Sequence, residues 1–244
     1  MNDNSGLVYK PNTSSSTIYV NIKGDGTLVK RLTGSEEEKY LTMKEEGLFK
    51  VNPKTQLSNE GIQIRQLESG DNKGDTVVEQ VYNEISNVQI MDCYKSEYDN
   101  RFSLNLVVKS IDNPNAPNVV VSMPYFDGEN TKAFSRTFID RIPNIDINKP
   151  ITITPCNFTD KKGKTVTCTV LHQEGIKIDS AFTKDKGDKP MAKKDVLKNG
   201  KVNWRWEEVG EFQDNILEKF IQKFKDQPHK EEAQENKEEV EMPF

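Results

Sequence analysis

The chain has 244 residues, of which 34% are hydrophobic and 30% are charged, and its formal net charge at pH 7 is −5. No apolar run approaches the roughly 20 residues of a membrane-spanning helix, and the polar N-terminus lacks the apolar core of a signal peptide. This composition argues against a helical membrane protein and predicts a cytoplasmic protein without a membrane partner.

The charge is unevenly distributed along the chain. Residues 225–244 hold three lysines and seven acidic residues, whereas residues 183–205 hold eight basic and three acidic residues. A basic segment therefore precedes an acidic end, so the negative net charge does not argue against a nucleic-acid partner. The alternative is that the lysines of the basic segment are merely solvated.

The first 70 residues are predicted to be β-rich. Residues 1–17 are polar and are expected to form a flexible lead-in. In chain order, the expected elements are a hairpin over 17–32, a helix over 35–46 and strands over 48–51 and 61–67. Lys-Gly-Asp-Gly at 23–26 supplies the turn of the hairpin, and Ser35 and Glu38 have the spacing of a capping box. We expect residues 18–70 to form an extension that packs on the next domain.

Residues 71–182 are predicted to form the main domain. The expected strands span 76–94, 101–111, 118–126, 150–158, 164–172 and 175–178, and a helix spans 131–142. Alternation is most regular in the second strand, where the even-numbered residues from Phe102 to Val108 share one apolar face. Three strands, a helix and a hairpin are the order of a five-stranded OB barrel. We therefore predict a mainly β protein built on an OB fold.

Three segments of different composition follow. Residues 183–206 are expected to form a basic arm that contains tryptophan. Over 207–225, apolar residues recur every three or four positions, which predicts an amphipathic helix. Its apolar stripe is expected to pack on the barrel; the alternative is a helix that faces a partner or a second copy. Residues 226–244 are expected to be a disordered acidic tail that binds proteins.

The tail combines carboxylates with an apolar tip. Its interaction residues are expected to be Glu238, Glu239, Glu241, Met242, Pro243 and Phe244. An aromatic ring beside a terminal carboxylate suits capture in a small apolar pocket rimmed by basic side chains. A purely solubilising tail is the alternative, and it accounts for the glutamates but not for the Met-Pro-Phe ending.

Residues 235–244 resemble the end of the single-stranded DNA-binding proteins of bacteria and their phages. The resemblance implies an OB domain that coats single-stranded DNA during replication, recombination or repair. It also implies, from Pro243 and Phe244, a tail that recruits polymerase, helicase or primase-like proteins. This chain lacks the long Gly/Gln/Pro-rich linker of the bacterial proteins, and Lys230 and Lys237 dilute its acidic tail. We therefore expect a phage-type protein that is a monomer or homodimer.

A protein that binds single strands needs aromatic faces for bases and cations for phosphates in one groove. Side chains of these kinds cluster at the turn between the first two barrel strands, at the end of the third, in the last hairpin and in the basic arm. The candidates are Tyr94, Lys95, Tyr98, Arg101, Tyr125, Phe126, Phe158, Lys161, Lys162, Lys164, Trp204 and Arg205. Tyr98, Tyr125 and Trp204 lie in polar sequence and are the favoured stacking residues, whereas Phe102 is expected in the core.

The sequence contains no P-loop, no Gly-x-Ser-x-Gly motif and no metalloprotease helix, so we expect no enzymatic activity. Cys93, Cys156 and Cys168 form no Cys-x-x-Cys pair, and we expect buried reduced thiols with no metal and no cofactor. Composition alone leaves a metal-dependent nuclease open. Two further alternatives are an adaptor that binds only proteins through its tail and helix, and a recombination protein that anneals strands.

Overall fold

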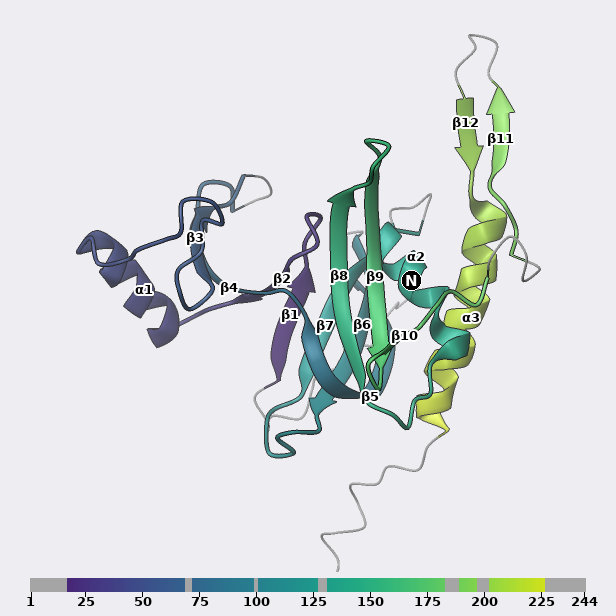
Figure 1. Ribbon diagram of the computed structural model, residues 1–244, viewed down its shortest axis with the longest axis horizontal. Coiled ribbons are helices and arrows are strands. Elements are labelled where there is room, and N and C mark those ends of the chain that lie inside the picture. Colours follow the sequence, from purple (N-terminus) through teal and green to yellow (C-terminus); the bar gives the residue numbers. More distant parts are fainter. Residues whose placement is uncertain are drawn as a thin grey trace, which may run out of the picture.

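The structure is a computed structural model, and it describes residues 17–68, 72–98, 101–126, 131–182, 189–196 and 202–226. Within these residues the protein is mainly β, with one large sheet, a separate two-stranded hairpin and one long C-terminal helix (Figure 1). The mainly β class and the C-terminal helix predicted from the sequence are confirmed.

The large sheet has ten strands in the order β10-β9-β8-β5-β6-β7-β1-β2-β4-β3. Its strands are β1 (Ile18–Ile22), β2 (Leu28–Arg31), β3 (Ile62–Gln66), β4 (Thr76–Tyr82), β5 (Ile85–Tyr98), β6 (Arg101–Ser110), β7 (Val119–Phe126), β8 (Ile151–Thr159), β9 (Thr165–Gln173) and β10 (Ile176–Lys177). The separate hairpin consists of β11 (Lys193–Val196) and β12 (Val202–Arg205). The helices are α1 (Ser35–Glu45), α2 (Ala133–Ile139), the 3-10 helix η1 (Ile142–Asn144) and α3 (Glu207–Lys225).

One hydrophobic core lies between the two halves of the curved sheet. It combines Leu106 of β6 and Met123 of β7 with Ile153 of β8 and Leu171 of β9. In Figure 1, β8 and β9 accordingly lie in front of β6 and β7. Helix α2 contacts both β7 and β9, and its fully buried Phe138 belongs to the same core. β7 and β9 are not hydrogen-bonded to each other, and the short helix α2 packs between them.

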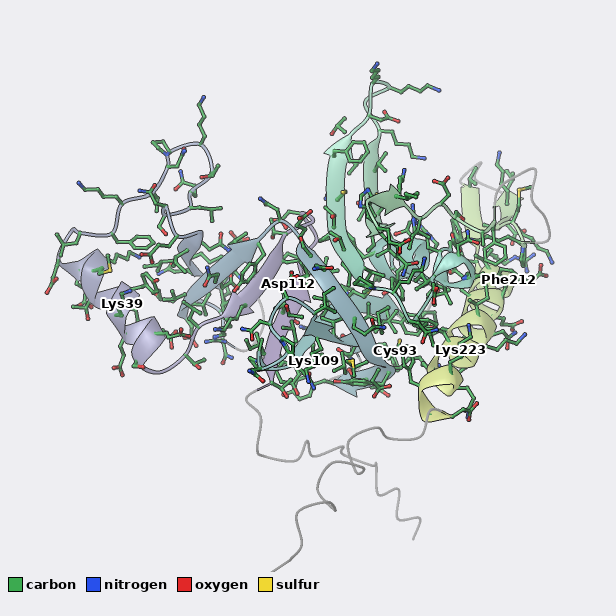
Figure 2. All side chains as sticks on the ribbon, turned by 60° about the horizontal axis from the view of Figure 1, so that its bottom comes forward. Lys39, Cys93, Lys109, Asp112, Phe212 and Lys223 are labelled. Atoms are coloured by element: carbon green, nitrogen blue, oxygen red, sulfur yellow. The ribbon has the colours of Figure 1, made fainter. Side chains whose placement is uncertain are left out.

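Helix α3 packs on the same core through its apolar stripe. Leu217 and Phe220 are fully buried, and the ring of Phe220 meets that of Phe138 edge to face at 6.3 Å between centroids. The expectation that this helix packs on its own domain is confirmed. Helix α1, which carries Lys39, lies at the opposite end of the molecule from α3, which carries Phe212 (Figure 2).

The predicted five-stranded barrel is not closed. β7 pairs with β6 on one side and in parallel with β1 on the other, where Ile18 to Asn21 lie opposite Val119 to Ser122. Both edges of β7 are thus occupied, and the described residues form an open sheet. The reason lies in the N-terminal segment. β1 has the alternating pattern of a strand and pairs with the edge of β7, so β1 and the strands β2 to β4 beyond it extend the sheet.

The turn between β1 and β2 contacts β8. Asn157 Nδ2 donates a hydrogen bond of 2.6 Å to the Gly24 carbonyl oxygen. Gly26 has a φ of +85°, and a Cβ built on it would lie 2.7 Å from the backbone nitrogen of Asn157. Only glycine fits both this backbone conformation and this approach. The turn thereby ties the N-terminal hairpin to the hairpin of β8 and β9.

A buried carboxylate fastens the N-terminal strands together. Glu79 of β4 is 5% exposed and accepts hydrogen bonds from Lys23 Nζ at 2.8 Å, Gln63 Nε2 at 2.7 Å and Arg65 Nε at 2.9 Å. Burial opposes the charge of Glu79, but the hydrogen bonds from Arg65, Lys23 and Gln63 outweigh it and lower its pKa to about 2. The carboxylate therefore joins β4 to β3 and to the turn after β1.

Several sequence-based element boundaries were wrong. The run expected over 76–94 is divided between β4 and β5, because Asn83 and Glu84 interrupt it with residues that rarely occupy strands. Residues 48–51 lie outside any strand, and α2 is shorter than the helix expected over 131–142. Ser35 is the first residue of α1 rather than its cap, and no side chain caps that helix.

We expect Gly26→Ala to lower the free energy of unfolding by about 2–3 kcal/mol, because alanine disfavours this φ and its Cβ would meet the β8 backbone. Urea denaturation measures the loss. Gly163→Ala isolates the conformational part, since Gly163 has a φ of +77° with no atom within 4 Å, and Gly24→Ala has neither problem. Equal losses for Gly26→Ala and Gly163→Ala would show that the contact with β8 does not matter.

Stability should depend on Glu79 in a defined pH range. Because its pKa falls from 4.5 in the unfolded chain to about 2 in the fold, its contribution is complete above pH 4.5 and is lost as the pH falls towards 2. Urea unfolding of the native protein and of Glu79→Gln, measured from pH 7 to pH 2, should show the gap in unfolding free energy narrowing by on the order of 3 kcal/mol. A gap that is constant with pH would contradict this role.

Candidate nucleic-acid interface

The second half of β5 carries three of the predicted site residues. The strand was expected to end at Tyr94, with Lys95 and Tyr98 in the following turn, but all three lie in β5, which extends to Tyr98. Side chains alternate along a strand, so Tyr94 and Tyr98 lie on one face of the sheet and Lys95 lies on the other. The residues of the predicted cluster are therefore divided between two faces.

A β-bulge determines which face each of them takes. Ile90 lies opposite Val108 and Asp92 lies opposite Val107, so Met91 is an extra residue in β5. Before the bulge the even-numbered Val88 and Ile90 are buried in the core, and after it the odd-numbered Cys93 is. The change of phase turns Tyr94 and Tyr98 away from the core.

The face turned away from the core is mainly polar over four neighbouring strands, and Asp92, Val107 and Val120 lie on it in the row of Tyr19. The register places Tyr94, Asn105, Ser122 and Asn21 in one row across β5, β6, β7 and β1. We call this surface the polar face, and it consists of Tyr19, Asn21, Tyr94, Ser96, Tyr98, Arg101, Ser103, Asn105 and Ser122. Near its centre, Asn105 Nδ2 donates a hydrogen bond of 2.8 Å to Ser96 Oγ, which fixes the amide.

The most exposed aromatic side chain of this face lies beside a cation. Tyr98 is 84% exposed and is the direct cross-strand partner of Arg101, which is also exposed. Tyr19, at the β1 side, is 51% exposed. Tyr94 is half-buried, and along the strand direction its row lies between the rows of Tyr98 and Tyr19. The polar face thus offers ring surface and a guanidinium within one strand pair, next to hydrogen-bonding side chains of neutral charge.

The turn between β8 and β9 carries the predicted basic cluster. We call Phe158, Lys161, Lys162 and Lys164 the lysine tip; Phe158 is 53% exposed and all three lysines are exposed. Asp160 Oδ1 accepts hydrogen bonds from the backbone nitrogens of Lys162 at 2.8 Å and Lys164 at 2.9 Å, so the turn has a defined shape. No ion pair joins these lysines to another described residue, which leaves their charges available to an anion.

Lys95 and Tyr125 do not belong to the polar face. Tyr125 is 8% exposed, and its hydroxyl donates a hydrogen bond to Asp214 of α3. Lys95 Nζ lies 3.0 Å from Asp214 Oδ1, pairs also with Glu218, and lies 5.9 Å from the centre of the Tyr125 ring. The prediction that Tyr125 is a surface stacking residue is therefore wrong: Lys95 and Tyr125 attach α3 to the sheet.

The electrostatics of this attachment follow from burial and charge. Burial raises the pKa of Tyr125, and the hydrogen bond to the Asp214 carboxylate raises it further. Burial opposes the charge of Lys95, but hydrogen bonds to Glu218 and Asp214 outweigh it and raise its pKa. Both side chains therefore keep their protons at neutral pH. Phe126, the neighbour of Tyr125, packs edge to face on Phe102 at 6.1 Å between centroids and borders the core.

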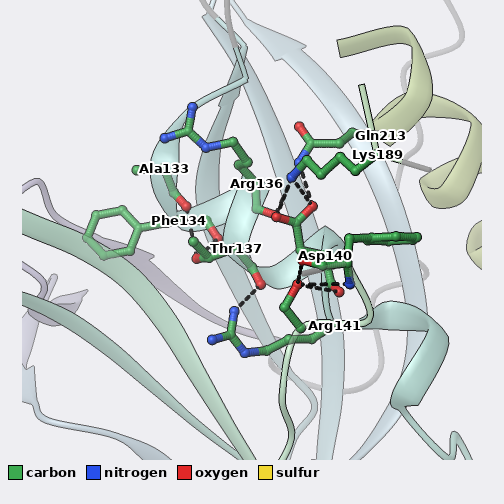
Figure 3. Close-up of polar contacts among 10 residues, drawn as sticks. Ala133, Phe134, Arg136, Thr137, Asp140, Arg141, Lys189 and Gln213 are labelled. Atoms are coloured by element: carbon green, nitrogen blue, oxygen red, sulfur yellow. Dashed lines mark hydrogen bonds and ion pairs between the residues drawn. The ribbon is translucent and has the colours of Figure 1, made fainter. Parts of the chain in front are cut away.

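The described cations of the basic arm are largely paired. Lys189 Nζ lies 2.6 Å from Asp140 Oδ1, which also accepts a hydrogen bond of 2.8 Å from Gln213 Nε2 (Figure 3). Lys193 pairs with Glu208, and Arg205 Nε lies 2.7 Å from Asp195 Oδ2. Because acidic neighbours hold these charges, the hairpin of β11 and β12 is a weaker anion site than the lysine tip.

Two groups of predicted site residues have side chains outside the described part of the chain. The backbone of Trp204 lies in β12 opposite Lys194, but its side chain is outside the described part of the chain. The tail residues Glu238, Glu239, Glu241, Met242, Pro243 and Phe244 are also outside the described residues.

The structure adds one aromatic residue that the sequence analysis did not select. Tyr19 shares the polar face because β1 pairs with β7, with Tyr19 opposite Val120. The alternation of Ile18-Tyr19-Val20-Asn21-Ile22 indicated that Tyr19 faces away from Val20 and Ile22. The local sequence could not indicate that β7 would be its neighbour.

No protein-family model, curated protein or solved structure matches the chain. Among the residues that the structure describes, no three His, Cys, Asp or Glu side chains group in a way that could hold a metal ion. No helix in this part of the chain is long and apolar enough to cross a membrane.

The hydrogen bond between Tyr125 and Asp214 should contribute to stability rather than to ligand binding. In a double-mutant cycle of Tyr125→Phe and Asp214→Ala, we expect a coupling of about 1 kcal/mol in the free energy of unfolding. The matched cycle of Tyr98→Phe and Asp214→Ala should show no coupling, because Tyr98 lies on the opposite face. Equal couplings in the two cycles would contradict this assignment.

Proposed function

We propose that this protein binds single-stranded DNA on the polar face and coats it without strong sequence preference during replication, recombination or repair. The observation that carries the proposal is the exposed Tyr98 directly opposite Arg101, at the end of the polar face, which also holds Tyr94 and Tyr19. Bases stack on aromatic rings whatever their sequence, and a guanidinium can neutralise a phosphate.

The strand order supports an OB-type site. Strands β9-β8-β5-β6-β7 are neighbours in this order, and α2 lies between the third and the fourth of them along the chain. We infer from this order an OB fold that is opened between its third and fifth strands. OB folds bind oligonucleotides on the face of strands two and three and with the turns after strands one and four. In this chain those parts correspond to β6 and β7, to the ends of β5 and β6 at Tyr98 and Arg101, and to the lysine tip.

The charge distribution suits a single strand. Asn105 is buried, but the exposed Asn21 and Ser96 of the polar face carry neutral amide and hydroxyl groups that can bond to base edges without repelling phosphates. Arg101 supplies a cation on the polar face itself, and the lysine tip supplies three more on the hairpin of β8 and β9. Four phosphate contacts from Arg101, Lys161, Lys162 and Lys164 would give a slope of about −3 for the logarithm of affinity against the logarithm of salt concentration. Binding would then be strongly salt-dependent.

The proposal includes the tail. We infer from its resemblance to the endings of single-stranded DNA-binding proteins that Pro243 and Phe244 recruit replication proteins to the coated strand. The adaptor alternative relied on both the tail and the apolar stripe of α3. Because Leu217, Phe220 and Ile221 are buried against the sheet, the stripe is not a free docking surface. An adaptor would therefore depend on the tail alone.

Fluorescence anisotropy with labelled oligothymidine and with a duplex of equal length tests the proposal. We expect preference for the single strand, and we expect Tyr98→Ala to weaken binding about tenfold, as loss of one stacked base requires. Tyr125→Phe is the control and should bind as tightly as the native protein. A protein without single-strand preference, or a Tyr98→Ala variant with unchanged affinity, would contradict the proposal.

The same titration distinguishes the lysine tip from cations elsewhere. Replacing Lys161 and Lys162 by glutamine should reduce the salt slope by about 1.4. Replacing Lys219 and Lys223, two exposed lysines of α3, changes the net charge equally and should leave the slope unchanged. Equal effects of the two double variants would indicate attraction to net charge rather than contact at the lysine tip.

A further inference from the structure

The hairpin of β8 and β9 places two cysteines directly opposite each other. Cys156 of β8 is the cross-strand partner of Cys168 of β9. Direct partners in antiparallel strands have Cα atoms about 4.5–5.5 Å apart, and a disulfide spans about 4.4–6.8 Å. The two side chains also point to the same side of the sheet. The backbone therefore has the geometry of a disulfide before any bond forms.

Both thiols are accessible. The core side of this hairpin is occupied by residues such as Ile153 and Leu171, which are fully buried, whereas Cys156 and Cys168 lie on the other side and are half-buried. The expectation that all three cysteines are buried was therefore wrong for this pair. Cys93 of β5, which is 0% exposed in the core, meets that expectation. The chain thus contains one enclosed thiol and one pair of neighbouring thiols that small molecules can reach.

The two thiols also influence each other. Burial raises the pKa of Cys156, and the adjacent Cys168 raises it further through charge and a hydrogen bond. The Cys156 thiol itself donates to the Thr154 carbonyl oxygen at 3.6 Å. Because the thiolate is the reacting form, the raised pKa of Cys156 slows its reaction at neutral pH, and it is the cross-strand register that favours a disulfide.

We propose that Cys156 and Cys168 are a modification site, which converts reversibly between a dithiol and a disulfide. Its reaction partners are small disulfides and reagents that bridge two thiols. The inference concerns the covalent state of the hairpin and does not depend on DNA binding.

The chemistry is thiol–disulfide exchange. The thiolate of one cysteine attacks a sulfur of a small disulfide RSSR, forms a mixed disulfide and releases one RS⁻. The thiolate of the second cysteine then attacks the sulfur of the first, forms the bond between β8 and β9 and releases the second RS⁻. The protein loses two electrons and two protons, and the oxidant becomes two molecules of RSH. An accessible disulfide of this kind is readily reduced again.

The disulfide would form close to the lysine tip and to the contact with the turn between β1 and β2. Phe158 and Val166 are the next residues of β8 and β9 on the same side, and the lysine tip follows. The turn at Gly26 also packs closely against the backbone of Cys156 and Asn157. A disulfide would fix the base of the lysine tip without changing the strand register.

The test uses the full chain in mixtures of oxidised and reduced glutathione, followed by alkylation, trypsin digestion and mass spectrometry. Trypsin cleaves after Lys161, Lys162 and Lys164, which lie between the two cysteines, so a disulfide would join two separate peptides. We expect oxidation to remove two of the three free thiols, to link the Cys156 and Cys168 peptides within one chain, and to be reversed by dithiothreitol.

Variants identify the residues. Cys93→Ser should retain the loss of two thiols, whereas Cys156→Ser should abolish the link and leave at most a glutathione adduct on Cys168. Circular dichroism of each variant checks the fold. The proposal is overturned if Cys156 and Cys168 stay alkylated or carry separate glutathione adducts at every ratio, or if the link involves Cys93 or a second chain.

Discussion

The bulge at Met91 is the constraint on which the arrangement of this protein depends. β5 pairs with β8 near its start and with β6 along most of its length, so it belongs to both halves of the curved sheet. A strand exposes alternate residues, and one inserted residue exchanges the two faces from that point on. Without the bulge, Tyr94 and Tyr98 would point into the core, and Cys93 would point away from it. The polar face and the packing of α3 both follow from this insertion.

The exchange of faces also explains how α3 is held. After the bulge, Lys95 points to the side on which α3 packs, where Asp214 and Glu218 meet it one helical turn apart. Tyr125 reaches the same carboxylate from β7. A lysine and a tyrosine at the margin of an apolar core would be poorly placed without these acceptors. The two acidic residues of α3 and the cation of β5 therefore form one structural unit, and the helix in turn covers the core with Leu217 and Phe220.

Much of this fold could be predicted from local patterns, and the errors have physical causes. The period of two in β6 and the period near 3.6 in α3 are undisturbed, so both elements were located correctly. β5 was truncated because the bulge breaks its alternation and because its end, Lys95-Ser96-Glu97-Tyr98, is polar on both faces. Tyr98 and Arg101 were correctly placed together because they are only three positions apart in the sequence and end consecutive antiparallel strands. Lys95 and Tyr125 were misassigned because their partners lie about 90–120 residues later in the chain. The pairing of Cys156 with Cys168 depends on the register of β8 and β9, which spacing alone does not give.

The parallel pairing of β1 with β7 has a consequence for how the chain can be divided. A fragment that begins near residue 71 would keep β4 to β10 but would lack β1, and the edge of β7 would present unpaired backbone groups to solvent. Such an edge recruits strands from other molecules and promotes aggregation. The shortest well-behaved form of this protein should therefore begin before Ile18, although the residues proposed to bind DNA lie mostly after residue 90.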